Sequence, residues 1–324
     1  MSDVLLLGGT GWLSARIAEG WLARGARVTC LARGGRPAPD GAELVVADRG
    51  EPGAYDAVTG RTWDEVVDVS SDPVAVSAAV EALGERARHW TYVSSISVYT
   101  DVTEPDADES AALAEPLEPG EEYDYPRAKA AAELAVRGRR GPTAVIRPGL
   151  IVGPGDPSDR FGYWPARFAL AGDGPVLVPV LDGASSQVID VDDLAPFLVD
   201  VGSRGWEGTA DAVGPSIPLA EVLDTARRLA GHSGRLVTAD DGWLCAHGVA
   251  YWMGPRSLPL WLPPGYGASR RRRGAMYRAA GGRIRPIEET VARTLTDERA
   301  RGLSRSRAAG LERAEELALL AALQ

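Results

Sequence analysis

The sequence predicts an α/β protein built on a doubly wound parallel sheet, with a smaller C-terminal part. Three observations predict this fold class. Continuous apolar runs alternate with helical stretches over the first 150 residues, as in a parallel sheet that helices cover on both faces. A glycine-rich turn follows the first apolar run and opens the first helical stretch. After residue 150 the helices become shorter, and Gly, Pro and Trp become frequent.

The elements of the main sheet can be placed in order. Short, mostly apolar runs predict strands at 4–7, 28–31, 44–46, 65–69, 90–93 and 144–146. Helical periodicity or alanine-rich composition predicts helices at 15–24, 74–83 and 125–136, and a terminal amphipathic helix at 311–323. A loop rich in Pro, Asp and Glu at 101–122 separates the fifth strand from the third of these helices.

One later segment, Gln187 to Leu194, reads as a strand running into a helix, and we expect it to return to the main sheet. The domains are then discontinuous. The main domain is predicted to comprise residues 1–150 plus about 186–201, and a substrate-binding part to comprise 151–185 and 202–324.

Composition limits the partners and the location. A net charge of −10 argues against a nucleic-acid or anionic-membrane partner, since both select basic surfaces. Only Cys30 and Cys245 occur, and Cys30 falls in a predicted buried strand, so we expect no disulfide and a reducing, cytoplasmic location. The sequence predicts no signal peptide, no membrane span and no metal site.

Lys129 is the only lysine among the 35 Lys and Arg residues, and the chain has no asparagine. Heavy use of Arg and Ala with almost no Lys or Asn indicates a strong coding bias. Under such a bias a lysine persists most easily where arginine cannot replace it. Lys129 is therefore the first place to look for chemistry.

The turn Gly8-X-X-Gly11-X-X-Ser14 is typical of a Rossmann-type dinucleotide site. There the first glycine permits the tight turn, the second lets the backbone approach the pyrophosphate, and the phosphates rest on the helix N-terminus. Ser14 takes the place of the third glycine. The residues expected to contact the cofactor here are Gly8, Thr10, Gly11, Trp12 and Leu13.

The end of the second strand favours NADP, with NAD as the alternative. An acid there would hydrogen-bond the ribose 2′-hydroxyl, whereas an arginine can accommodate the 2′-phosphate. The sequence reads Leu31-Ala32-Arg33-Gly34, with no acid, so Arg33 points to NADP. Asp48, after the third strand, is either a contact for the adenine amino group or a turn residue.

Tyr125 and Lys129 are the candidates for proton transfer. Residues four apart share one helix face, and a tyrosine with a pKa near ~10 needs a nearby cation to act at neutral pH. Lysine supplies that charge and can also hold a ribose hydroxyl. The run Val93 to Tyr99 ends the fifth strand at the mouth of the sheet, where a serine can hydrogen-bond a substrate.

Over nearly the whole chain these residues resemble the extended short-chain dehydrogenase/reductase family, which includes nucleotide-sugar epimerases. The motifs that carry the resemblance are Gly8 to Leu13, Ser94 to Tyr99, Tyr125-X-X-X-Lys129, Arg147-Pro148-Gly149 and Ile189 to Leu194. The resemblance implies that Ser95 is the catalytic serine, Tyr125 the general acid/base and Lys129 its partner. It also implies that the segment from Pro148 to Ile151 flanks the nicotinamide. The family's catalytic asparagine has no counterpart, so a proton relay needs water or backbone. The other candidates are Ser70 for the cofactor and Ser71, Ser97 and Trp164 for the substrate.

Within this family we expect an NADPH-dependent reduction of a carbonyl on a small organic substrate. Dehydratases carry Asp-Glu after the catalytic Ser/Thr, whereas this chain has Ile96 and Ser97. One alternative is a nucleotide-sugar epimerase with tightly bound NAD. Another is a non-catalytic NAD(P)-binding regulatory or RNA-associated protein, for which Arg270 to Arg273 is a candidate anion-binding patch. The alanine-rich helix at 126–137 favours a homodimer.

Overall fold

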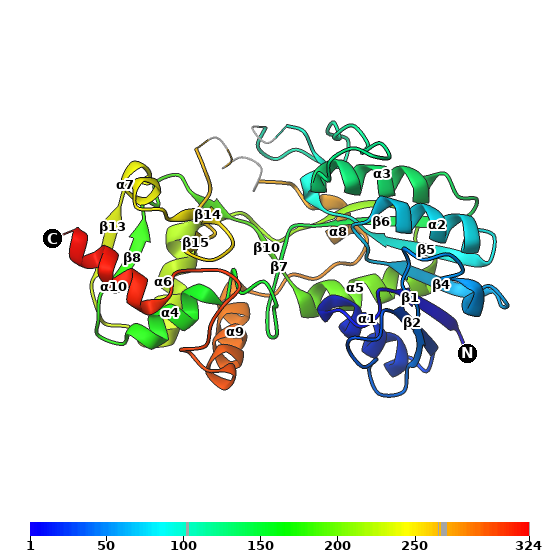
Figure 1. The fold of residues 1–324 in the computed structure, drawn as a ribbon, viewed down its shortest axis with the longest axis horizontal. Coiled ribbons are helices and arrows are strands. Elements are labelled where there is room, and N and C mark those ends of the chain that lie inside the picture. The colour runs from blue at the N-terminus through cyan, green and yellow to red at the C-terminus, as the bar shows by residue number, and fades with distance from the viewer. Residues whose placement is uncertain (102–103, 265, 267–270, 324) are drawn as a thin grey trace.

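A seven-stranded parallel sheet is the largest element of the computed structural model, which describes residues 1–101, 104–264, 266 and 271–323 (Figure 1). Six of its strands fall on the predicted segments, which confirms the α/β fold class. The strand order is β11-β6-β5-β4-β1-β2-β3. The strands are β1 (Asp3–Leu7), β2 (Arg27–Ala32), β3 (Glu43–Val46), β4 (Trp63–Asp68), β5 (Ala87–Val93), β6 (Thr143–Pro148) and β11 (Gly208–Ala212).

Helices cover both faces of this sheet, because side chains alternate between the two sides of each strand. From β1, Val4 and Leu6 pack in one hydrophobic core with α1 (Trp12–Ala23) and α5 (Val191–Arg204). Leu5 and Leu7 pack on the other side with α2 (Pro73–Leu83) and α3 (Tyr125–Arg137). The sheet is therefore doubly wound, and its carboxyl edge opens on one side of the molecule.

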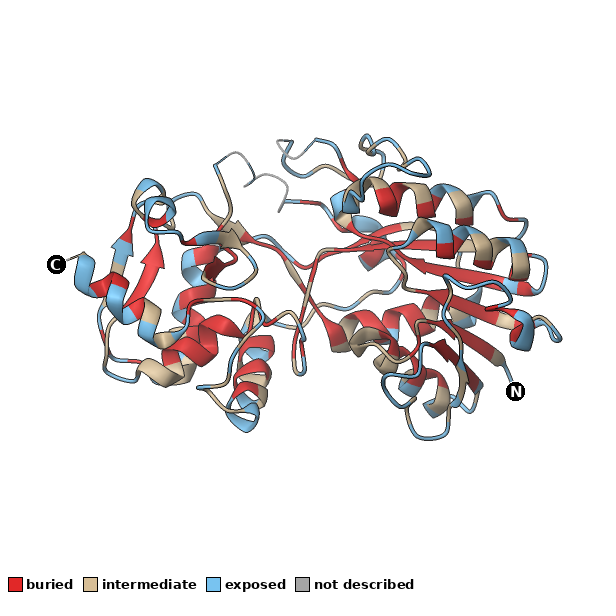
Figure 2. Ribbon diagram, in the orientation of Figure 1, coloured by how far each residue is buried: buried red, intermediate tan, exposed pale blue. Residues whose placement is uncertain are grey.

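A third core forms the second lobe, and Figure 2 shows buried residues concentrated separately in the two lobes. Its helices are α4 (Tyr163–Ala171), α6 (Leu219–Ala230), α7 (Asp241–Ala246), α9 (Ile287–Arg301) and α10 (Arg313–Ala322). Its short strands are β8 (Val176–Pro179) with β13 (Leu236–Ala239), β9 (Ser185–Ser186) with β12 (Ile217–Pro218), and β14 (Ala250–Trp252) with β15 (Ser257–Pro259). The short helix α8 (Ala275–Ala279) returns to the main sheet beside β11.

The expectation that residues 187–194 supply a strand of the main sheet is wrong. Strand β10 (Val188–Asp190) instead pairs in parallel with β7 (Leu150–Val152), in a two-stranded sheet that lies between the lobes (Figure 1). The edge beside β6 is taken by β11, whose Gly208 pairs with Ala144. The predicted helix does follow as α5 and packs under the main sheet. The predicted domain boundaries remain a prediction.

Among the described residues, none of the helices combines the length and the hydropathy that a membrane span requires.

Candidate active site

The glycine turn between β1 and α1 leaves the helix N-terminus open to a ligand. Gly8 has a φ of +86°, which a side chain rarely tolerates, and a Cβ on Gly9 would lie 2.6 Å from the Cβ of Cys30. Gly11 precedes the helix, and no side chain caps the first amides of α1. These free N–H groups and the helix dipole fit the pyrophosphate of a dinucleotide.

Ser14, which replaces the third glycine of the pattern, is used inside the turn. Its hydroxyl donates a 2.8 Å hydrogen bond to the carbonyl oxygen of Gly8, and the side chain is buried. The serine therefore ties the first turn of α1 to the end of β1.

The two residues proposed for the adenosine end both lie on the surface. Arg33 follows β2 and makes no salt bridge within the described part of the chain, so its guanidinium is available to a 2′-phosphate. Asp48 is exposed, and its carboxylate accepts the N–H of Gly50 at 3.0 Å. Asp48 thus acts as a turn residue, and its contact with an adenine remains a prediction.

Lys129 is buried on α3, at 3% exposure. Its ammonium group donates to the carbonyl oxygens of Ser70 at 2.8 Å and Val93 at 2.7 Å, and lies 4.8 Å from the ring centre of Tyr92. Burial lowers the pKa of Lys129 to about 8. A compact ammonium fits between these two carbonyls, and it retains one further N–H to donate.

Tyr125 is the first residue of α3, one helical turn before Lys129. The carboxylate of Asp124 caps the helix by accepting the N–H of Arg127 at 3.0 Å, and Pro126 occupies the first turn, where no N–H is needed. Burial raises the pKa of Tyr125, while a hydrogen bond with Ser95 and the charge of Arg160 act in the opposite direction.

Ser95 ends the extended segment after β5. Its oxygen accepts the N–H of Ser97 at 3.1 Å and its hydroxyl lies 3.1 Å from the hydroxyl of Ser97. This contact begins a short 3₁₀ helix over Ile96–Val98. The local turn fixes the Ser95 side chain at the carboxyl edge of the sheet.

A cavity of about 1050 Å³ joins these groups and lies between the lobes. Of the candidate residues, those that line it are Trp12, Ser95, Ser97, Tyr125, Pro148 and Ile151. Lys129, Ser70 and the glycine turn lie outside its lining. The cavity thus brings Ser95, Tyr125 and the predicted nicotinamide-flanking segment to one space, but not Lys129.

Several lining residues come from segments that sequence reasoning did not single out. They are Arg160, Tyr251, Trp252, Met253, Leu262 and Tyr266. They lie far along the chain from Tyr125, and no spacing rule connects them to it. Only the structure marks Trp252 as unusual: this residue at the cavity wall has a φ of +68°, which is rare for a residue other than glycine.

Beneath the cavity, Glu133 and Arg147 form a buried ion pair. Arg147 donates two hydrogen bonds to the Glu133 carboxylate, at 2.8 and 2.6 Å, and Ser94 donates a third at 2.6 Å. Burial opposes ionisation of Glu133, but these donors hold the pKa of its carboxyl below the ordinary value. Ser94 therefore has a structural partner.

The arginine run at 270–273 is not a free patch in the part that the structure describes. Arg272 is buried, donates to Asp211 at 2.6 Å and stacks 3.3 Å above the ring centre of Tyr99. Arg271 pairs with Asp106 at 3.1 Å. Arg270 lies outside the described residues.

The structure does not bring Trp164 to the cavity. Its ring is 1% exposed in the core of the second lobe, and its indole N–H donates to the carbonyl oxygen of Pro259 at 2.7 Å. Ser71 is half-buried after β4 and lies outside the cavity lining.

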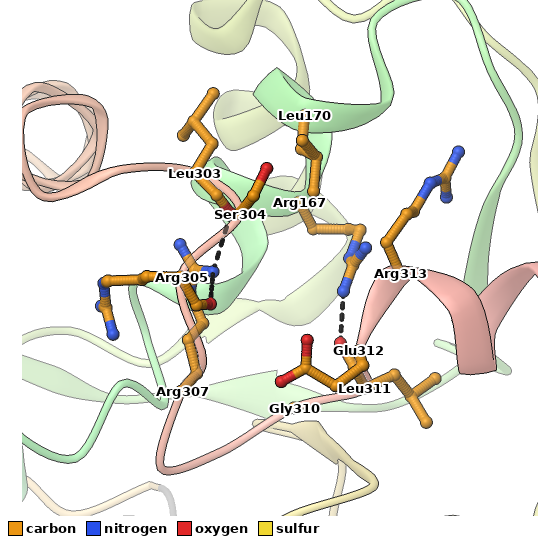
Figure 3. A pocket seen from close by; sticks show the side chains of 10 residues that line it. All are labelled: Arg167, Leu170, Leu303, Ser304, Arg305, Arg307, Gly310, Leu311, Glu312 and Arg313. Carbon is orange, nitrogen blue, oxygen red and sulfur yellow. Dashed lines mark hydrogen bonds between the residues drawn. The ribbon is translucent and has the colours of Figure 1, made fainter.

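A second, smaller cavity of about 140 Å³ lies beside Arg167, in the second lobe (Figure 3). Figure 3 shows Arg167 pointing from α4 toward the carbonyl oxygen of Leu311, to which it donates. The other arginines of this cavity pair with carboxylates: Arg305 and Arg307 with Glu298, and Arg313 with Glu316. Its charges are therefore used in holding the lobe together.

The fold and the open glycine turn define a nicotinamide-dinucleotide-dependent enzyme of the short-chain dehydrogenase/reductase type. The chain belongs to the NAD dependent epimerase/dehydratase family, whose model matches residues 4–208. No protein of curated function matches the sequence.

Solved structures share the fold over nearly the whole chain. A protein from Burkholderia cenocepacia J2315 has 22% identity and a TM-score of 0.72, covering 92% of this chain and 98% of its own. WbmH from Bordetella bronchiseptica, in complex with NAD+, has 17% identity and a TM-score of 0.64, with coverages of 92% and 98%. UDP-glucose 4-epimerase from Thermotoga maritima, with UDP-glucose, has 13% identity and a TM-score of 0.67, with coverages of 92% and 99%.

Proposed function

We propose that the protein is an NADPH-dependent reductase that acts on a carbonyl group of a small organic substrate. The observation that carries the proposal is the cavity shared by Ser95, Tyr125 and the segment from Pro148 to Ile151. Arg33, exposed at the end of β2 where no acid follows the strand, supports NADPH as the preferred cofactor.

In the proposed mechanism the hydroxyls of Ser95 and Tyr125 hydrogen-bond the substrate carbonyl oxygen. The glycine turn and the segment from Pro148 to Ile151 would hold a reduced nicotinamide dinucleotide, which would supply the hydride for the carbonyl carbon. Tyr125 transfers its proton to the oxygen as negative charge develops there. Lys129 holds its two carbonyl partners and uses its remaining N–H for a ribose hydroxyl or a water. That water would return a proton to Tyr125, in the place of the missing asparagine.

The charges of the cavity favour a small substrate over a nucleotide sugar. The described lining residues include two arginines, Arg160 and Arg272, and Arg272 is already paired with Asp211. A nucleoside diphosphate carries at least two negative charges and needs cations to match them. The epimerase alternative draws its support from the fold that the chain shares with UDP-glucose 4-epimerase.

Mass spectrometry of the native protein tests the proposal. Protein purified without added cofactor should carry no dinucleotide, should bind NADPH more tightly than NADH, and should oxidise NADPH in the presence of a carbonyl panel. Retained NAD with no net oxidation would instead assign epimerase chemistry. NADPH binding with no turnover, together with affinity for RNA, would assign the non-catalytic alternative.

We also propose that the protein is a homodimer and that it is located in the cytoplasm. Leu134 on α3 is 63% exposed and Val74 on the adjacent helix α2 is 67% exposed, which supports a contact through these helices. The location rests on the composition, with only two cysteines. Light scattering of the wild type and of Leu134→Glu tests the dimer.

A further inference from the structure

Arg160 lies on the cavity wall, just before α4. Its Nε donates to the hydroxyl of Ser158 at 3.1 Å, and its guanidinium carbon lies 5.1 Å from the ring centre of Trp252. Among the described residues, Arg160 makes no salt bridge, and its two terminal nitrogens make no hydrogen bond. These contacts hold the planar group in place and leave its terminal N–H groups to a ligand.

The other arginine of the cavity lining is not available in this way. Arg272 is bonded through its Nε to Asp211 and lies flat on Tyr99. It also donates to the carbonyl oxygen of Asp108. Arg160 is therefore the cation of the described lining that can take a new partner.

The adjacent Asp159 pairs with Arg301 and Arg305. Asp156, the acid of the cavity lining that is nearest in sequence, is bonded within its own loop. Its carboxylate accepts the N–H of Ser158 at 2.8 Å and the hydroxyl of Ser158 at 2.9 Å. Burial raises the pKa of Asp156, while the hydrogen bonds from Ser158 and the charge of Arg160 act in the opposite direction. Ser158 thus stands between Asp156 and Arg160, and the guanidinium keeps its positive charge on the cavity side.

Arg160 is also close enough to the reacting groups to act on the same substrate. It lines the cavity together with Ser95 and Tyr125, and its charge opposes the burial that raises the pKa of Tyr125. Tyr251, Met253 and Leu262 add aromatic and apolar side chains to the lining. A guanidinium with two free N–H groups matches the two oxygens of one carboxylate.

We infer that Arg160 binds a carboxylate of the substrate, so that the substrate class is an oxo acid with an apolar or aromatic body. The inference rests on the proposed reductase function, because it places the oxo group at Ser95 and Tyr125. Trp252 supports the guanidinium from one side, and its strained backbone is held by the 3.0 Å hydrogen bond from its N–H to Trp261.

Two matched probes test this inference: benzoylformate, which carries the carboxylate, and its uncharged methyl ester. Their binding to the NADP-loaded protein is measured by quenching of tryptophan fluorescence, and their reduction by NADPH oxidation. The variants are Arg160→Gln, Arg160→Lys and, as a control, Arg228→Gln. Arg228 is an exposed arginine on α6 in the same lobe, paired with Glu288.

The wild type and Arg228→Gln should bind the acid about 10- to 100-fold more tightly than the ester, the range expected for a charge-assisted pair of hydrogen bonds. Arg160→Gln should lose this preference while its affinity for NADPH is unchanged. Arg160→Lys keeps the positive charge but not the planar guanidinium, so it should retain part of the preference for the acid. Equal binding of acid and ester by the wild type, or an unchanged preference in Arg160→Gln, would overturn the inference.

Binding and turnover separate this inference from the proposed function. Acid binding that depends on Arg160 without NADPH oxidation would support the carboxylate site and count against reduction. Reduction of the ester at least as fast as the acid would support the reductase and overturn the carboxylate site. Thermal melting of each variant confirms that it is folded before either result is used.

Discussion

Lys129 donates a hydrogen bond of 2.7 Å from its ammonium group to the carbonyl oxygen of Val93, the last residue of β5. A second hydrogen bond, to the carbonyl oxygen of Ser70, ties the same group to the segment after β4. The lysine therefore joins α3 to two strand ends of the main sheet. The compact ammonium of lysine and the planar guanidinium of arginine differ in shape and donor geometry, which gives a physical reason for the single lysine of the chain.

The burial of Lys129 predicts a particular dependence of stability on pH. Its pKa falls from the ordinary value of 10.5 to about 8 in the folded protein. Between these values the unfolded chain binds more protons than the folded one, so stability rises with pH. Relative to Lys129→Met, the free energy of unfolding of the wild type should increase by up to about 3 kcal/mol from neutral pH to pH ~10.5.

Urea unfolding of both proteins at several pH values in this range measures the difference. Other groups titrate equally in the two proteins and cancel. A difference that does not change with pH would show that Lys129 keeps its ordinary pKa.

Tyr125→Phe should reduce turnover by about 10²- to 10⁴-fold, because the phenol is the proposed proton donor. The affinity for NADPH should stay within about twofold, since the ring remains. Ser95→Ala should lower turnover as well, and Ser95→Thr, which keeps a hydroxyl, should restore part of it. Steady-state kinetics with the substrate found in the carbonyl panel measure these effects. Near-normal turnover by Tyr125→Phe would remove Tyr125 from the mechanism.

Arg33→Ala should weaken NADPH binding by about 10-fold or more while leaving NADH binding nearly unchanged. The reason is that Arg33 is proposed to contact only the 2′-phosphate, which NADH lacks. Arg36, an exposed arginine three residues further along, offers a matched control as Arg36→Ala. Fluorescence titration with each dinucleotide measures both affinities. An equal loss for NADH and NADPH would mean that Arg33 does not select between them.

The main sheet was accessible from the sequence because the signals of its strands are local, whereas the catalytic roles remain predictions. Apolar runs marked the strands of the main sheet up to β6, and the four-residue spacing marked the face that Tyr125 and Lys129 share on α3. Strand β11 was missed, since Gly208-Thr209-Ala210-Asp211-Ala212 has no apolar run. Its pairing with β6 depends on the tertiary structure, as does the displacement of β10 from the sheet.

The cavity wall was not accessible for a similar reason. Trp164 and Trp252 look alike in sequence, yet one is buried in the second lobe and the other faces the cavity. Arg160 is one of many arginines, and its place on the cavity wall without a salt bridge to a described residue distinguishes it. Such differences arise from how two lobes meet, and no spacing within the chain records them.

The buried ion pair under the cavity predicts a large and specific loss of stability. Arg147→Met leaves Glu133 buried without its main donor, so the free energy of unfolding should fall by about 3–5 kcal/mol. Removing both charges, in Glu133→Leu with Arg147→Met, should recover much of this loss because no unpaired charge remains. Arg137→Ala is the matched control. Arg137 also contacts Glu133, at 3.2 Å, but is 41% exposed, so its loss should cost less than about 1 kcal/mol.

The ion pair of Glu133 and Arg147 also predicts how the free energy of unfolding falls at acid pH. Because the pKa of Glu133 is lowered in the folded protein, its contribution is present above the ordinary value near 4.5 and is lost as the pH falls through the folded value. The stability of the wild type relative to the double variant should therefore decline below about pH 4.5. Urea unfolding from neutral to acid pH measures this decline. If Arg147→Met and Arg137→Ala lose equal stability, Arg147 is not the residue that compensates the buried charge of Glu133.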